Sequence, residues 1–199
     1  MISFIGISKA EPYKEFINLY KQAALKGQRP IEAVSVSSYN KMMNEVESRF
    51  VNLKYISNEE WIFFTNYNSK KAIDFSQHDQ ISALLYWNSI NVQIRIKAKI
   101  VKTSEEFSDQ HFNSRSKKKN ALAISSKQSD PIKTYEEVVI NYENILNSEN
   151  NTLERPSYWG GYSFFPYYFE FWEGHGSRLN KRKVYEYQNN KWKYSILQP

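Results

Sequence analysis

Near its middle the chain reads Asn91-Val92-Gln93-Ile94-Arg95-Ile96-Lys97-Ala98-Lys99-Ile100, an unbroken alternation of polar and apolar side chains. Successive side chains of a β-strand point to opposite faces of its sheet, so this stretch predicts a strand with one buried and one solvated face. Such strands are typical of antiparallel sheets, because parallel sheets are usually covered on both faces. We therefore expect residues 91–103 to form a long strand of an antiparallel sheet.

Segments rich in β-branched and aromatic residues surround this strand. They predict further strands at residues 33–38, 47–56, 61–67, 81–87, 167–172, 183–187 and 192–197. Asn58 and the pair Asn189-Asn190 mark turns between them, since asparagine tolerates the left-handed backbone that tight turns need. Because the strands mostly follow one another directly, their order favours a mainly β fold, an antiparallel barrel with peripheral helices, over an alternating βαβ fold.

Helices are expected at three places. Residues 12–26 carry apolar side chains at helical spacing. Residues 69–77 predict a short helix with Ser69 as a possible N-cap. Residues 104–149 predict a helical insertion between the strands, and residues 148–157 a polar loop that follows it.

The composition is that of an ordinary globular chain with a basic surplus. Its length of 199 residues favours one domain, residues 1–199, with a C-terminal segment at about 156–199. Lys and Arg number 27 against 21 Asp and Glu, and the net charge of +6 favours an anionic partner: a phosphorylated small molecule, nucleic acid or an acidic membrane. The absence of cysteine excludes disulfides and thiol chemistry, and the three histidines lack metal-ligand spacing, so no metal is expected. The sequence contains neither a signal peptide nor a membrane-spanning stretch, which favours the cytoplasm.

Four basic clusters are candidate ligand contacts: Arg49 with Lys54, Lys70 with Lys71, residues 115–119, and Arg178 with Arg182. Exposed Lys and Arg are usually only solvated, so each cluster also has an interpretation without function. Arg49 and Lys54 interrupt an otherwise apolar strand, and their spacing places them on opposite faces unless a bulge realigns them. Lys70 and Lys71 begin a helix, whose free N–H groups suit a phosphate.

Two later segments also bear on ligand binding. The basic run 114–119 is a solvated loop, a nucleic-acid patch or a lid over an anionic substrate. Farther on, Trp159-Gly160-Gly161 precedes a pair of arginines, and an aromatic wall with fixed cations suits a planar ligand that carries a phosphate. Arg178, Asn180 and Arg182 alternate, so an extended segment would place all three on one side.

Six motifs, in register along residues 11–199, resemble the pyridoxamine 5′-phosphate oxidase family. They are Arg49-Phe50-Val51-Asn52-Leu53-Lys54, Phe63-Phe64-Thr65-Asn66-Tyr67-Asn68-Ser69-Lys70-Lys71-Ala72, Gln93, Ser114-Arg115 followed by Ser126-Lys127-Gln128-Ser129, Pro156-Ser157-Tyr158-Trp159-Gly160-Gly161, and the stretch from Glu170 to Arg182. One such motif would be weak, but six in order are specific. The resemblance implies a split β-barrel that binds FMN in the interface of a homodimer.

The resemblance also implies which residues form the site. The implied FMN contacts are Arg49, Phe50, Val51, Lys54, Phe64, Thr65, Lys70, Lys71, Gln93, Gln128, Ser129, Trp172 and Arg182. The implied substrate contacts are Lys54, His111, Arg115, Lys119, Arg178 and Asn180, and the catalytic candidates among them are Arg178 and Asn180. Two phosphates, one on FMN and one on the substrate, would give the basic clusters a common purpose.

The implied activity is the oxidation of pyridoxamine or pyridoxine 5′-phosphate to pyridoxal 5′-phosphate, a step of vitamin B6 metabolism, with O2 as acceptor and hydrogen peroxide as product. The implied partners are these small molecules and a second copy of the chain, without nucleic acid or a membrane. The chain departs from the family at four positions. His111 stands where the family commonly has Tyr, Lys119 where it has Ser, Asn180 where it has His, and Lys70 where it has Arg.

These departures keep two alternatives open. The first is an FMN-dependent oxidase of the same fold that acts on another ring, as phenazine-type relatives do. The second, favoured by the basic surplus and the many aromatic residues, is a non-catalytic protein that binds flavin or nucleic acid.

Overall fold

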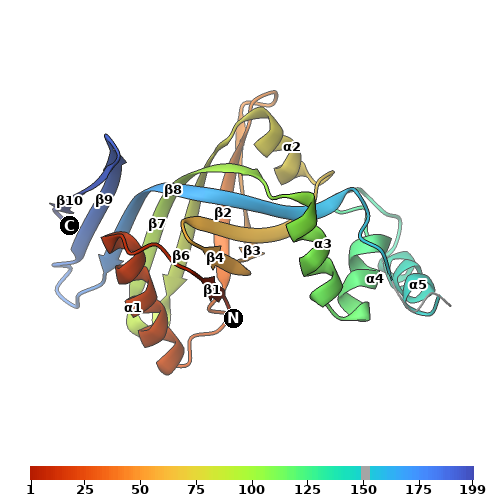
Figure 1. Ribbon diagram of the computed structural model, residues 1–199, viewed down its shortest axis with the longest axis horizontal. Coiled ribbons are helices and arrows are strands. Elements are labelled where there is room, and N and C mark those ends of the chain that lie inside the picture. The colour runs from red at the N-terminus through yellow and green to blue at the C-terminus, as the bar shows by residue number, and fades with distance from the viewer. Residues whose placement is uncertain (149–152) are drawn as a thin grey trace.

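A computed structural model describes residues 1–148 and 153–199, and its strands form one large sheet (Figure 1). The strand order is β1-β4-β5-β8-β7-β6-β2-β3, with β9 paired to β8 and β10 to β9. The strands are β1 Ser3–Ile5, β2 Ala33–Asn40, β3 Glu45–Asn52, β4 Tyr55–Ser57, β5 Glu60–Asn66, β6 Gln80–Trp87, β7 Val92–Lys102, β8 Trp159–Glu173, β9 Lys181–Gln188 and β10 Lys191–Leu197. All pairs are antiparallel except β1 with β4, so the prediction of a mainly β, antiparallel fold with peripheral helices is confirmed.

The helices lie around the sheet. They are α1 Glu11–Leu25, α2 Lys70–Gln77, α3 Glu105–Ser114, α4 Lys117–Ser125 and α5 Tyr135–Leu146, with one 3-10 turn at Asn88–Ile90. Helices α3 to α5 gather at one end of the molecule, and the β9–β10 hairpin lies at the other (Figure 1). Strand β8 runs between these two ends, so it connects two parts of the fold that carry predicted site residues. No helix within the described ranges is long and apolar enough to cross a membrane.

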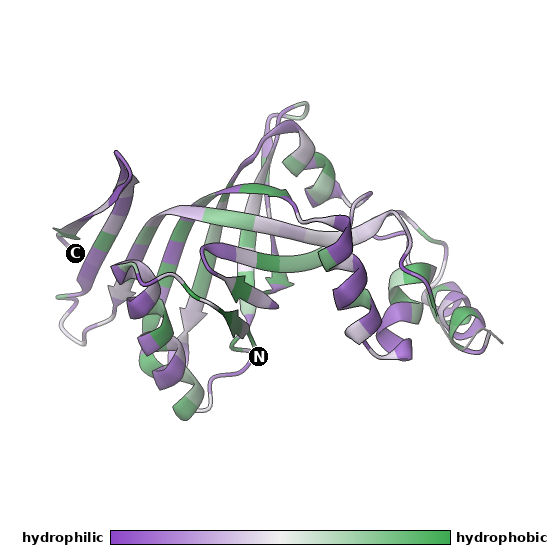
Figure 2. Ribbon diagram, viewed as in Figure 1, coloured by the Kyte–Doolittle hydropathy of each residue, from purple (hydrophilic) through white to green (hydrophobic). Residues whose placement is uncertain are grey.

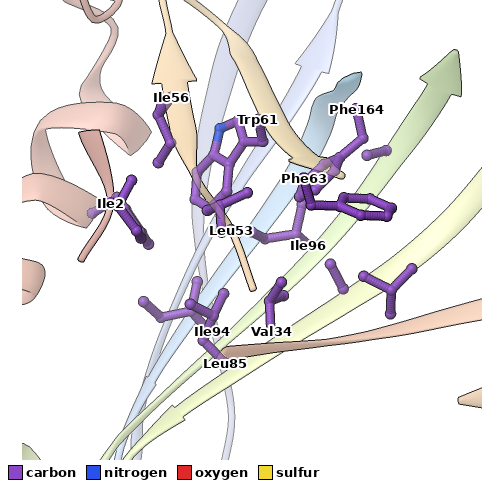
Figure 3. Packing of buried hydrophobic residues seen from close by; sticks show 14 of the residues in the cluster. Ile2, Val34, Leu53, Ile56, Trp61, Phe63, Leu85, Ile94, Ile96 and Phe164 are labelled. Carbon is purple, nitrogen blue, oxygen red and sulfur yellow. The ribbon is translucent and has the colours of Figure 1, made fainter. Parts of the chain in front are cut away.

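The alternation around residue 96 forms the predicted two-faced strand. Along β7 every second side chain from Val92 to Ile100 is buried, while the intervening polar side chains are exposed or half-buried. The buried face joins a core that includes Val34, Leu53 and Phe63, whose side chains converge in Figure 3. Burying an aliphatic or aromatic side chain of this size contributes about 1.5–3 kcal/mol each.

Helix α1 confirms the helix predicted at residues 12–26. Its apolar stripe of Tyr13, Phe16 and Tyr20 is buried against the sheet, and its other face is polar (Figure 2). Phe16 packs edge-on against Trp61 with ring centroids 4.5 Å apart. The helix therefore covers one face of the sheet through aromatic contacts.

The strand predicted at residues 47–56 is interrupted, which the sequence pattern did not indicate. β3 ends at Asn52, and β4 begins at Tyr55. Between them the amide of Leu53 donates to the carbonyl of Glu32 (2.9 Å), and the amide of Lys54 donates to that of Ile62 (2.8 Å). Leu53 is buried in the core, so the chain turns a corner at this position and leaves one neighbouring strand for another.

Strand β8 is much longer than the predicted strand at residues 167–172, because its first half pairs with β5 and its second half with β9. The glycine pair lies inside this first half. A side chain at Gly160 would collide with the Tyr67 hydroxyl, and one at Gly161 would come within 2.6 Å of Thr103 Oγ1. The glycines therefore allow two side chains to pack directly on the strand.

Three smaller predictions have different outcomes. The turns at Asn58 and at Asn189-Asn190 are confirmed, because all three residues adopt positive φ angles of 50° to 60°. Ser69 does precede α2, but its hydroxyl donates to the carbonyl of Asn66 and does not cap the helix. In the predicted loop 148–157, residues 149–152 lie outside the described residues.

Candidate active site

A cavity of about 830 Å³ opens between β3, β5, α2 and the α3–α4 end of the molecule. Its lining includes many of the predicted site residues, namely Arg49, Phe50, Val51, Lys54, Phe64, Thr65, Lys70, Lys71, His111, Arg115, Lys119, Gln128 and Ser129. The remaining lining residues are Glu47, Ser48, Asn52, Ser114, Ser116 and Trp159. Its volume is within the range of about 300–1,000 Å³ that is usual for cofactor and ligand sites.

The cavity is strongly basic. Six Lys and Arg side chains line it against one carboxylate, that of Glu47. Like charges held in a concave site raise the electrostatic potential there and attract anions. An anionic ligand, above all one with a phosphate, is therefore the chemistry that this lining suits.

Arg49 and Lys71 form the part of the cavity beside the start of α2. The Arg49 guanidinium donates to the Ser38 hydroxyl (2.6 Å) and to Glu47 (3.0 Å). Lys71 is buried and donates to the Ser69 hydroxyl at 2.9 Å. Burial, and secondarily the charge of Arg49, lowers the pKa of Lys71 to about 8. A bound phosphate would supply the counter-charge that stabilises the protonated form of Lys71.

A buried carboxylate holds Arg49 from behind. Asp74 of α2 accepts hydrogen bonds from the Ser38 hydroxyl (2.5 Å) and the Asn40 amide (2.9 Å). It lies 3.9 Å from Arg49 Nη2, so Ser38 bridges the carboxylate and the guanidinium. This network fixes the guanidinium, which reduces the entropy lost when an anion binds.

Stacked rings form the opposite wall of the cavity. The His111 ring lies on Phe64 with centroids 3.7 Å apart and planes 15° apart, and Trp159 stacks on Phe64 at 5.4 Å. The Arg115 guanidinium lies over the Trp159 ring at 4.4 Å. Strands β5 and β8 and helix α3 thus present a flat surface with a cation beside it. The aromatic wall was predicted from Trp159, but the cation beside it is Arg115 and not the predicted Arg178 or Arg182, which do not line the cavity.

His111 is neutral at physiological pH. Burial is the largest cause, followed by the charges of Arg115, Lys54 and Lys119, and together they lower the pKa of His111 to about 4. The Nδ1 atom of His111 lies 2.9 Å from the hydroxyl of Tyr55. His111 therefore faces the basic cavity as an uncharged ring that can hydrogen-bond.

Cations without carboxylate partners surround His111. Among the described residues, Lys54 and Lys119 have no ion-pair partner, and the buried Nη1 atom of Arg115 has no hydrogen-bond partner. Burial, opposed by Glu32 and assisted by Lys119 and Arg115, lowers the pKa of Lys54. Lys54 therefore shares this part of the cavity with two further cations, an arrangement that suits an anion.

The loop after α4 closes the cavity between these two walls. Gln128 Oε1 accepts from the Thr65 hydroxyl (3.1 Å) and from the amide of Asn66 (3.3 Å). Ser129 follows with a positive φ of 78°, which turns the chain at the rim. These bonds occupy the acceptor atom of Gln128 and leave its amide nitrogen available to a ring edge.

The other predicted residues lie elsewhere in the chain. Gln93, Trp172 and Arg182 sit opposite one another on β7, β8 and β9, and directly opposed residues share one face of a sheet. This row, called here the Gln93 row, includes β9 and the second half of β8, and β9 lies at the opposite end of the molecule from α3 and α4 (Figure 1). The structure therefore gathers the predicted site into two separate groups.

A buried carboxylate anchors the Gln93 row. Glu170 is only 1% exposed and accepts from Arg182 (2.9 Å), Arg95 (2.8 Å) and the Tyr168 hydroxyl (2.9 Å). Arg182 also donates to the carbonyl of Gln198 at 3.0 Å. The guanidinium of Arg182 is thus fixed on one side of the sheet.

Arg178 and Asn180 do not form the extended segment predicted from their spacing. Arg178 adopts a left-handed backbone with φ 63° in a turn, its side chain is exposed, and Asn180 accepts from the amide of His175 at 3.0 Å. Only Arg182 belongs to a strand, so the alternation does not place the three side chains on one face. Neither Arg178 nor Asn180 lines the large cavity of its own chain.

The spacing of Arg49 and Lys54 left two arrangements open, opposite faces or a realigned strand, and the structure interrupts the strand between them. Both line the same cavity, because the corner at Leu53 resets the alternation between them. Sequence reasoning missed Tyr55, which contacts His111, and the carboxylates of Asp74 and Glu47, which lie beside Arg49. The partners of Tyr55 and Asp74 are far away in sequence, so no local pattern signals either contact.

Two family models match the chain. One, described as pyridoxamine 5′-phosphate oxidase, matches residues 29–148, and the other, described as the pyridoxine 5′-phosphate oxidase C-terminal dimerisation region, matches residues 159–199. The first holds most of the large cavity, and the second holds Trp172 and Arg182 of the Gln93 row.

The chain is also similar to curated proteins. It is 37% identical to the pyridoxine/pyridoxamine 5′-phosphate oxidase of Cytophaga hutchinsonii, over 90% of this chain and 84% of that protein. It is 33% identical to the chloroplastic pyridoxine/pyridoxamine 5′-phosphate oxidase 1 of Arabidopsis thaliana, over 96% of this chain but only 37% of that longer protein.

Two solved structures share the fold. PhzG of Burkholderia lata, solved with tetrahydrophenazine-1-carboxylic acid, superimposes with a TM-score of 0.90 at 28% identity, and the match covers 96% of this chain and 93% of that one. An FMN-binding, pyridoxamine 5′-phosphate oxidase-related protein of Nostoc punctiforme superimposes with a TM-score of 0.78 at 12% identity, covering 96% and 99% of the two chains.

Proposed function

The chain belongs to the pyridoxine/pyridoxamine 5′-phosphate oxidase family of FMN-dependent oxidoreductases, and we propose that it oxidises pyridoxamine or pyridoxine 5′-phosphate to pyridoxal 5′-phosphate. O2 is the acceptor and hydrogen peroxide the second product. The observation that carries this proposal is the basic cavity with a stacked aromatic wall, which offers cations for two phosphates and a flat surface for rings. The alternative of a non-catalytic protein does not agree with membership of an enzyme family.

The residues of the cavity fit FMN. Among the described residues the buried cation of Lys71 has a hydroxyl as its only partner, and Arg49 beside it is held by Ser38, so this end suits the cofactor phosphate. Thr65 and Gln128, joined by a hydrogen bond, suit the polar edge of a flavin ring. We assign the cofactor to this part of the cavity, with Lys70 as an exposed additional cation.

The substrate phosphate is assigned to the second set of cations. Lys54, Arg115 and Lys119 have no carboxylate partners among the described residues and surround the neutral His111. They would orient the pyridine ring beside the aromatic wall, which is a positioning effect. Bound FMN supplies the acceptor for the hydride that leaves C4′ of the substrate. With pyridoxamine 5′-phosphate, one O2 and one water are consumed, and ammonia and hydrogen peroxide are released.

A homodimer would unite the two groups of site residues. Helices α3 and α4, which contribute to the cavity, and strand β9, which carries Arg182 of the Gln93 row, lie at opposite ends of the chain (Figure 1). A two-fold axis would allow the row of one chain to lie over the cavity of its partner. The match of residues 159–199 to a dimerisation region supports this arrangement. Arg178 and Asn180, which lie outside the cavity of their own chain, would then reach the substrate from the partner.

Complementation between two inactive variants tests the shared site. Lys71→Met damages the cavity, and Arg182→Ala damages the Gln93 row. In a mixed dimer one site carries both changes and the other carries neither, so FMN binding and activity should return to about half of the wild-type level per dimer. If each chain binds FMN alone, every mixed dimer has two damaged sites and nothing returns.

Anaerobic reduction tests the reaction itself. The protein reconstituted with FMN is mixed with pyridoxamine 5′-phosphate in the absence of oxygen, and the flavin absorbance is followed. Bleaching, followed by recovery of the colour in air and release of pyridoxal 5′-phosphate, is the expected result. A flavin that stays oxidised would contradict the proposed substrate but not the cofactor.

An oxidase of phenazine-type substrates is the second candidate. The similarity to PhzG and the departures at Lys119 and Asn180 favour it. The same anaerobic experiment with tetrahydrophenazine-1-carboxylic acid separates the two candidates, because that acid has no phosphate for the cations around His111. Faster bleaching by the phenazine acid than by pyridoxamine 5′-phosphate would favour this second function.

A further inference from the structure

Tyr55 lies behind His111 and does not line the cavity. Its hydroxyl is 2.9 Å from His111 Nδ1, and the two rings meet edge to face at 86° with centroids 5.4 Å apart. Tyr55 also packs edge-on against Phe107 of α3 and Phe64 of β5. Its position is therefore set by the β4 strand on one side and by aromatic contacts on the other, independently of any ligand.

The His111 ring has little freedom to turn. It stacks on Phe64 at 3.7 Å, and its Nδ1 atom is engaged by Tyr55. Among the described residues, its Nε2 atom has no hydrogen-bond partner, and Nε2 is thus the ring nitrogen left to a ligand in the cavity. A neutral imidazole has a proton on only one of its two ring nitrogens. The partner of Nδ1 therefore decides whether Nε2 donates or accepts a hydrogen bond.

We propose that Tyr55 is a positioning residue that donates its hydroxyl proton to His111 Nδ1, fixes the proton of the ring on Nε2, and so makes His111 a hydrogen-bond donor to an anion in the cavity. The surrounding charges favour this direction. Lys54, Arg115 and Lys119 attract an anion toward His111, and an anion needs a donor, whereas the other tautomer would present a lone pair to it.

The inference deepens the proposed function without depending on it for its main test. If the proposed function holds, the anion is the phosphate of the substrate, and Tyr55 acts on it only through His111. The state of the His111 ring is a property of the protein before any substrate binds. It can be measured even if the substrate assignment fails.

Nitrogen NMR of the holoenzyme labelled with ¹⁵N-histidine reads the tautomer directly. His111→Gln identifies the His111 signals among those of the three histidines. The expected result at neutral pH is a neutral ring protonated at Nε2 in the wild type, and a mixture of tautomers in Tyr55→Phe. A ring protonated at Nδ1 or doubly protonated in the wild type would overturn the proposal, as would an unchanged tautomer in Tyr55→Phe.

Titration with inorganic phosphate tests the effect on an anion. Phosphate should shift the Nε2 signal of the wild-type holoenzyme and bind roughly fivefold more weakly to Tyr55→Phe, the scale of one ordinary hydrogen bond. Tyr135→Phe, which changes an exposed tyrosine on α5, serves as the matched control and should bind phosphate like the wild type.

A double-mutant cycle separates positioning from packing. In a His111→Tyr background there is no imidazole for Tyr55 to orient, so Tyr55→Phe should leave phosphate affinity unchanged there. An equal loss in both backgrounds would mean that Tyr55 acts by packing and would overturn the proposal. Failure of pyridoxamine 5′-phosphate to reduce the flavin, with the Nε2 tautomer present, would count against the proposed function alone.

Discussion

The ammonium group of Lys71 donates to the hydroxyl of Ser69 at 2.9 Å, and both side chains are buried. A buried cation that has only a neutral partner destabilises the folded protein until an anion binds beside it. We infer that Lys71 lowers the stability of the apoprotein and raises its affinity for the cofactor.

Lys71→Met should separate these two effects. The free energy of unfolding of the apoprotein should stay constant or rise, because the buried charge is gone, while FMN should bind roughly 10- to 100-fold more weakly through loss of a charged hydrogen bond. Urea unfolding and a fluorescence titration with FMN measure the two quantities. Lys70→Met, whose side chain is 70% exposed, is the control and should change both much less. A large loss of apoprotein stability in Lys71→Met would contradict this account.

Lys71 also makes the stability of the apoprotein depend on alkaline pH. Its pKa is about 8 in the folded protein and 10.5 in the reference state, so the unfolded chain binds more protons between these values. The free energy of unfolding should therefore gain a positive contribution as pH rises from about 8 to 10.5. Lys71→Met should lack this contribution in urea unfolding series at both pH values.

The neutral state of His111 predicts an effect at acidic pH. Its pKa is about 4 in the folded protein and 6.5 in the reference state, so the unfolded chain binds more protons in between, and stability should fall as pH drops from 6.5 to 4. His111→Gln should show a shallower fall across this window in urea unfolding. An unchanged slope in this variant would mean that burial and the charges of Arg115, Lys54 and Lys119 do not hold His111 neutral.

Arg178→Ala should slow turnover far more than it weakens FMN binding. The exposed Arg178 contacts nothing in the cavity of its own chain, and its proposed role is to hold the substrate against the flavin from the partner chain. Loss of a charged hydrogen bond lowers kcat/KM roughly 10- to 100-fold. Steady-state kinetics and an FMN titration give the comparison, with Lys181→Ala as the neighbouring control. Equal loss of turnover and FMN affinity would remove this division of roles.

Glu170→Gln should destabilise the protein and loosen Arg182. The amide leaves two arginines without their buried counter-charge, and we expect a loss of about 2–3 kcal/mol, below the ~3–5 kcal/mol for removing a buried partner outright. Thermal unfolding measures the loss. Glu173→Gln on the same strand changes an exposed carboxylate and should cost little. Similar losses in the two variants would mean that the burial of Glu170 does not matter.

Gly160→Ala should cost about 1–3 kcal/mol, because the new methyl group forces the Tyr67 hydroxyl away from β8. Gly176→Ala is the matched control, since no atom lies within 4 Å of its added methyl group. Urea unfolding compares the two variants. If Gly160→Ala is as stable as the control, Tyr67 can move at no cost and the glycine is not required for packing.

Features set by local patterns could be predicted from the sequence. The alternation around residue 96 and the apolar stripe of α1 each depend on neighbours within a few residues, and both elements form as expected. Most of the residues that line the cavity were predicted from the resemblance to a known family. Their roles stay predictions, as do the single domain and the cytoplasmic location.

Features set by distant contacts could not be predicted in this way. β1 consists of three residues and exists because it pairs with β4 far along the chain, and Tyr55 meets His111 only because α3 packs on β5. The turn that removes Arg178 from an extended path is likewise invisible in the alternation of residues 178–182. Spacing predicts which face a residue occupies only where the strand continues without interruption.

The corner at Leu53 and Lys54 fixes the number of residues between β3, which lines the cavity, and β4, which carries Tyr55. Deleting or inserting a single residue there would shift the register of β4 against β1 and β5, and a slip of one residue turns every side chain of a strand to the other face. Tyr55 would then point away from α3 while Arg49 kept its place. At this corner a change in chain length is therefore expected to be more damaging than a change of side chain. Insertions near the site should be tolerated only in other connections between elements.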